Sequence, residues 1–168
     1  MAKKGEEWSD EYAQFKDLVV TLDGSNSTTL VEVQHDTNLS VRGGFIWEMH
    51  ALEYIIEGIS LGAVMRTQWA LSTQKGKAAI PELGDTGLYA RGEYVQIMTT
   101  SGAIASIWPQ WFVWAPAIPC ASPNLSMYAK TSVDAAAVRG TKIRARLHYT
   151  TKKTDANVYT ELAELWGG

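Results

Sequence analysis

The segment that most restricts the fold of this chain is 141–152, TKIRARLHYTTK, in which apolar and polar side chains alternate. A repeat of two is the period of a β-strand that is buried on one face and solvated on the other. The pattern therefore predicts a strand of an antiparallel sheet. Its core-facing side chains are Ile143, Ala145, Leu147 and Tyr149, and its outward side chains are Lys142, Arg144, Arg146, His148 and Lys152.

Most of the remaining chain after residue 14 also has the texture of strands. The expected strands are 15–22, 28–35, 45–59, 65–73, 93–100, 104–114 interrupted at Pro109, and 125–130. We expect a long loop over 75–91 and a turn-rich corner at Pro116, Pro119 and Pro123. Because helices do not alternate with these strands, a βαβ architecture is disfavoured.

Two segments break the simple alternation. In 45–59 the apolar phase flips at Leu52, which is typical of a β-bulge or of a strand that changes sheets. The segment 157–166, NVYTELAELW, predicts a short helix capped by Asp155 or Asn157. Its expected buried stripe comprises Val158, Leu162, Leu165 and Trp166. The whole pattern predicts an all-β fold, an antiparallel eight-stranded jelly-roll sandwich with a short C-terminal helix.

Length and composition indicate one domain. The chain has 168 residues, of which 46% are hydrophobic, so it can bury a single core. We expect a flexible N-terminal segment over 1–14 and one jelly-roll domain over 15–168. The start, MAKKGEEW, lacks the apolar stretch of a secretory signal, and no apolar run is long enough to span a bilayer. These features predict a soluble protein made in the cytoplasm.

Charge and reactive residues exclude several functional classes. Fifteen Lys and Arg against eighteen Asp and Glu disfavour a strongly basic nucleic-acid binder. The outward residues of 141–152 are either a solvated sheet face or, with Lys3 and Lys4, a weak contact for nucleic acid or lipid through Arg144 and Arg146. Cys120 is a single cysteine, and His35, His50 and His148 are isolated in sequence. We therefore expect no catalytic residue, metal or cofactor, although His35 and His50 could still meet Glu48 or Glu53 across neighbouring strands.

Tryptophan is abundant, with seven residues, and three of them crowd one segment. Trp108, Trp111 and Trp114 are not spaced by two, so they cannot all face the core from one regular strand. A subunit contact, a core position and a sugar-stacking platform are the alternatives for this cluster. We expect the subunit contact.

The order of these pieces resembles a known group of proteins. The long strand RGGFIWEMHALEYIIEG, the corner WFVWAPAIPCASPNLSMYAK and the basic strand GTKIRARLHYTTKKT that runs into the helix carry the resemblance. They are similar to single jelly-roll major capsid proteins of small icosahedral viruses of bacteria or archaea. The resemblance implies a structural protein of the virion, made in the host cytoplasm, that assembles with itself, and with other capsid proteins where present, into an icosahedral shell.

One departure from that group concerns the genome. Many small capsid proteins begin with an Arg-rich arm, whereas this chain has only Lys3 and Lys4 there. The departure favours a shell that encloses an internal membrane, or a genome whose charge is neutralised by other means. In either case we expect the protein to contact nucleic acid or membrane only weakly. The alternative function is a carbohydrate-binding β-sandwich module or a virion fibre head.

Overall fold

The computed structural model describes residues 14–22, 30–40, 44–57, 64–97, 109–132 and 141–165. Within these ranges the chain forms eight strands and one helix. The expected N-terminal segment lies outside the described residues except for Gln14, which begins the first strand. In chain order the elements are β1 (Gln14–Leu22), β2 (Val31–Asp36), β3 (Phe45–Glu57), β4 (Val64–Ser72), β5 (Leu88–Ile97), β6 (Gln110–Cys120), β7 (Asn124–Thr131), β8 (Thr141–Lys153) and α1 (Ala156–Leu165).

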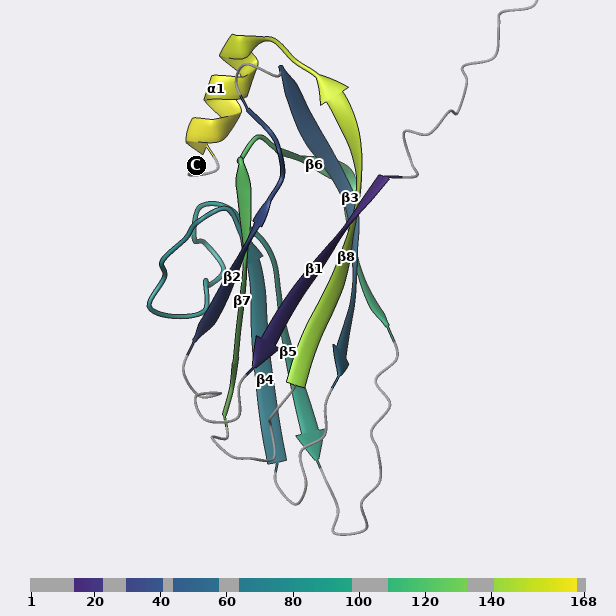
Figure 1. Ribbon diagram of the computed structural model, residues 1–168, viewed down its shortest axis with the longest axis vertical. Coiled ribbons are helices and arrows are strands. Elements are labelled where there is room, and N and C mark those ends of the chain that lie inside the picture. The colour runs from purple at the N-terminus through teal and green to yellow at the C-terminus, as the bar shows by residue number, and fades with distance from the viewer. Residues whose placement is uncertain are drawn as a thin grey trace, which may run out of the picture.

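The strands form two four-stranded antiparallel sheets that face each other, as Figure 1 shows. One sheet has the order β1-β8-β3-β6 and the other has the order β2-β7-β4-β5. Strand β1 pairs with β8, β2 with β7, β3 with β6 and β4 with β5. The pairing is that of one long hairpin whose two arms are wrapped into a sandwich. This connectivity is the jelly roll, and it confirms the predicted fold class.

The core fills the space between the two sheets. Ile143, Ala145 and Leu147 on β8 are buried, and the Tyr149 ring stacks on Trp47 with 3.9 Å between ring centroids. The inner face predicted for this strand is therefore confirmed. The register of β3 against β6 and β8 shifts between Met49 and Ala51, so the phase flip in the sequence is a β-bulge.

The strand boundaries of β5 and β6 differ from the sequence prediction. β5 begins at Leu88, inside the expected loop, and β6 runs through Pro116 and Pro119, where a turn-rich corner was expected. Proline is tolerated there because β6 lies at the edge of its sheet among the described strands, where backbone N–H groups on the free side need no ladder partner. The expected strand positions 104–108 lie outside the described residues.

The C-terminal helix packs across the end of the sandwich where β3 begins and β8 ends (Figure 1). The Asp155 carboxylate caps it, accepting a hydrogen bond of 2.9 Å from the Val158 N–H. The buried contacts join Tyr159, Leu162 and Ala163 to Ile46 and Ala121.

The prediction of which helix residues are buried was wrong in part. Val158 and Leu165 are exposed, whereas Tyr159 is almost fully buried, because the surfaces offered by β3 and the end of β6 decide which side of the helix is covered. Trp166 lies outside the described residues. The described part of the chain contains no helix that is long and apolar enough to cross a membrane.

Candidate functional site

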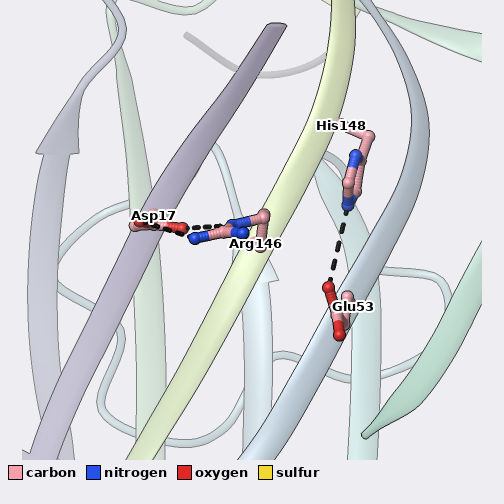
Figure 2. A network of polar contacts seen from close by, with 4 residues as sticks. All are labelled: Asp17, Glu53, Arg146 and His148. Atoms are coloured by element: carbon pink, nitrogen blue, oxygen red, sulfur yellow. Dashed lines mark hydrogen bonds and ion pairs between the residues drawn. The ribbon is translucent and has the colours of Figure 1, made fainter. Parts of the chain in front are cut away.

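The outer face of the β1-β8-β3-β6 sheet brings together most of the residues that the sequence singled out. The strand registers place Asp17, Arg146, Glu53 and Trp111 side by side in one row across all four strands. Each of these side chains points away from the core, because its neighbours along the strand are the buried ones. The charged part of this row, with His148, is drawn in Figure 2.

Arg146 is held by two neighbours on β1. Its Nε and Nη2 atoms donate to the two Asp17 carboxylate oxygens at 2.8 and 3.2 Å. These hydrogen bonds lower the pKa of Asp17 and raise the pKa of Arg146, so both groups are ionised near neutral pH. The guanidinium also lies over the Phe15 ring, 4.4 Å from its centroid.

Two other basic side chains of β8 also form ion pairs. Arg144 Nε donates to Glu57 Oε2 and Lys152 Nζ donates to Glu48 Oε1, each at 2.8 Å. The acids on β1 and β3 thus offset much of the positive charge of β8, which weakens its attraction for phosphate groups. Lys3 and Lys4, the other residues expected at a nucleic-acid or lipid contact, lie outside the described residues.

The histidines are placed on different parts of the fold. The His148 ring lies tilted by 31° against the Trp111 ring, with 5.3 Å between ring centroids. Its Nε2 lies 3.9 Å from Glu53 Oε2 (Figure 2). His50 Nε2 lies 3.0 Å from the Thr150 hydroxyl, whereas His35 is on β2 in the opposite sheet. Among the described residues no three His, Cys, Asp or Glu side chains form a group able to hold a metal.

The structure separates the tryptophans that the sequence grouped as a subunit contact. Trp111 points outward with 54% of its surface exposed. Trp114 points inward, packs against the core and donates its Nε1 hydrogen to the Tyr89 carbonyl oxygen at 3.3 Å, so it joins the two sheets. Trp108 lies outside the described residues.

Exposed apolar residues accompany Trp111 on this face. The registers align Phe15, His148, Ala51 and Val113 in a second row beside the charged one. Phe15 is 52% exposed and Val113 is 70% exposed. We call Phe15, Ala51, Trp111 and Val113 the apolar belt. Phe15 and Val113 were not singled out in the sequence, although Val113 shares the alternation phase of Trp111.

A shallow hollow of about 240 Å³ lies beside the belt on the same face. Its lining includes Asp17, Val19, Glu53, Ile55, Arg144 and Arg146. Carboxylates and guanidinium groups around an apolar floor can hydrogen-bond a neutral polar molecule. Because Asp17 is held ionised by Arg146, it does not supply the protonated carboxyl that glycoside hydrolysis requires.

Two comparisons of the chain with known proteins found no match. No protein-family model matches it, and no curated protein is similar to it in sequence.

Proposed function

We propose that this protein is a viral capsid protein that assembles with itself into an icosahedral shell of a virus of bacteria or archaea. The observation that carries the proposal is that large apolar side chains are exposed in several separate regions. They are found on the outer sheet face, on the edge strand β5, in the loop between β4 and β5, and on the helix: Phe15, Trp111, Val113, Val95, Leu83, Val158 and Leu165.

Several exposed apolar regions favour a subunit with several neighbours. A ligand-binding domain needs one concave site, whereas each subunit of a closed shell contacts different neighbours through different surfaces. Large exposed apolar groups are typical of such contacts. The net charge of −3 also allows many copies to approach without strong repulsion. The jelly roll supports the proposal, although this fold serves lectins and cupins as well.

The test is the size of the purified full-length protein. We expect light scattering to report particles far larger than one 18.5 kDa chain, and negative-stain microscopy to show closed shells of uniform diameter. Assembly should respond to protein concentration and to salt. A protein that remains monomeric or dimeric under all such conditions, with its fold intact by circular dichroism, would contradict the proposal.

Carbohydrate binding is a second candidate, favoured by one feature. An exposed indole lies directly beside a carboxylate at Glu53 and near the guanidinium of Arg146, and sugar rings stack on aromatic faces while their hydroxyls bind such groups. A glycan array with the wild-type protein and a Trp111→Ala variant tests it. Binding of a glycan that disappears in the variant, without any shell formation, would favour a sugar-binding module or a fibre head.

A further inference from the structure

We propose that the apolar belt is a two-fold contact with a second copy of this chain, in which Phe15 of each copy packs against Val113 and Trp111 of the other. The inference deepens the proposed function and rests on it for the presence of many copies. It names one particular surface and one particular pairing.

The belt has the shape that such a contact needs. It crosses all four strands, from Phe15 on the edge strand β1 to Val113 on the edge strand β6. Three strand spacings separate these two ends, which is about 14 Å. When the two-fold axis lies in the plane of the contact and runs parallel to the strands, the residue at one end of the belt meets the residue at the other end in the partner. An axis near Ala51 and His148, at the middle of the belt, would bring the two unlike ends together.

The charges of the same face favour a copy of the chain as the occupant. Its outward acids equal its outward bases in number, with Asp17, Glu48, Glu53 and Glu57 against Lys142, Arg144, Arg146 and Lys152. Arg146, Arg144 and Lys152 already hold three of these acids in ion pairs. A face with equal numbers of acids and bases, most of them already in ion pairs, can be covered by its own copy without strong like-charge repulsion. A nucleic acid or an anionic membrane would instead require an excess of positive charge.

The arrangement of the ion pairs keeps the belt free for this contact. Asp17 and Glu53 flank Arg146 in the row that ends at Trp111, so these charged groups border the row of Phe15, Ala51 and Val113 along one side. An apolar centre with a polar border is the usual anatomy of a protein interface. The guanidinium of Arg146 over the Phe15 ring also holds that ring in place before any partner arrives.

A cysteine pair tests the contact directly in the full-length chain. The native Cys120 is fully buried, so an oxidant at the surface acts on introduced thiols. We propose the double variant Phe15→Cys/Val113→Cys. Its two thiols are too far apart to join within one chain, because disulfides require Cα atoms closer than about 7 Å. A disulfide must therefore link two copies.

The expected result is a disulfide-linked dimer that forms under mild oxidation and is at least about tenfold more abundant than in either single variant. The matched control is Thr21→Cys/Val113→Cys, because Thr21 is exposed on the same strand and face but outside the belt. The control should remain largely uncrosslinked. Equal crosslinking in both double variants, or none in the belt variant, would overturn the inference.

A second measurement covers the case in which cysteines disturb the surface. Val113→Asp places a charge at the end of the belt that is proposed to meet Phe15 of the partner, at a position that is exposed in the monomer. It should weaken dimerisation by at least about tenfold while the circular dichroism spectrum stays unchanged. Unchanged dimerisation of the folded variant would overturn the inference.

The two proposals fail in different ways. Specific crosslinks in a protein that never forms shells would support the belt contact and contradict the capsid function. Shells that form from wild-type protein, while the belt variant shows no specific crosslink, would support the capsid function and contradict the belt contact. A monomer that binds a glycan at Trp111 and shows no crosslink would contradict both.

Discussion

Gly92 in the middle of β5 makes room for the largest side chain of the core. Trp69 is fully buried on β4, directly opposite this glycine, and packs against the rings of Tyr54 and Phe112. A Cβ atom added at Gly92 would lie 2.5 Å from Cε2 and 2.7 Å from Cζ2 of the indole. The indole thus occupies the space that any residue other than glycine at position 92 would need for its side chain.

Gly92→Ala is therefore expected to destabilise the protein by about 1–3 kcal/mol, because the indole must shift within a close-packed core. Urea unfolding followed by tryptophan fluorescence measures both the stability and the changed environment of Trp69. The matched control is Arg91→Ala, at a partly exposed neighbouring position, which should change the free energy of unfolding by less than about 0.5 kcal/mol. Equal effects of the two changes would contradict this account.

His35 ties stability to pH. Its Nε2 is buried without a hydrogen-bond partner among the described residues, and burial, together with the charge of Lys16, lowers its pKa below the ordinary value of 6.5. The unfolded chain therefore binds a proton more readily than the folded one. The stability contributed by the neutral ring is complete above about pH 6.5 and is lost as the pH falls below it.

We expect the free energy of unfolding to decrease between about pH 7.5 and 5.5, and His35→Gln to remove part of that decrease. Urea unfolding at several pH values measures both proteins. His50→Gln, which changes a histidine of β3 in the opposite sheet, serves as the comparison. An identical pH dependence in His35→Gln and wild type would show that His35 titrates equally in the folded and unfolded chains.

At the scale of single elements, β8 lies inside its sheet, between β1 and β3, and one of its faces is buried along the strand. Leu147 is fully buried at its middle. Leu147→Ala should lower the free energy of unfolding by about 2–5 kcal/mol, through lost apolar burial and the cavity left behind. Lys153→Ala, at the exposed end of the same strand, is the control. A loss below about 0.5 kcal/mol for Leu147→Ala would mean that the faces of β8 are reversed.

The sequence predicts elements best where one face alone is buried. Alternation identified β8 and its core residues, and the phase flip identified the bulge in β3, because both patterns follow directly from the pleat. The prediction failed over the start of β5 and the second half of β6, where the glycines and prolines suggested a loop and a turn-rich corner. Those residues serve tertiary needs there: Gly92 accommodates Trp69, and the prolines of β6 occupy a sheet edge.

The candidate site was predicted only in part, for a related reason. The residues of β8 and Trp111 were identified, but separating Trp111 from Trp114 requires knowing that one regular strand runs through both. The neighbours that define the face, Phe15 on β1 and the acids that hold Arg144 and Arg146, come from strands distant in sequence. Only the register of the folded sheet places them together.

At the scale of the whole molecule, the paired charges limit contacts with nucleic acid. Arg144 and Arg146 each hold a carboxylate, and the chain as a whole is acidic. We expect weak binding to single- or double-stranded nucleic acid that is lost between about 50 and 200 mM salt. Fluorescence anisotropy with labelled oligonucleotides measures it. Tight binding that persists at several hundred millimolar salt, and is lost in Arg144→Ala/Arg146→Ala, would instead assign a genome contact to these residues.

The prolines of β6 also disfavour the addition of strands from other molecules to this sheet edge. An open sheet edge can recruit a strand from another molecule, and repeated recruitment produces fibrils. Pro116 and Pro119 lie on such an edge and offer no N–H for an added strand over the second half of β6. The addition of a strand, and with it the growth of fibrils, is therefore disfavoured at this edge. Any molecule that bound there would do so through side chains instead of a shared sheet.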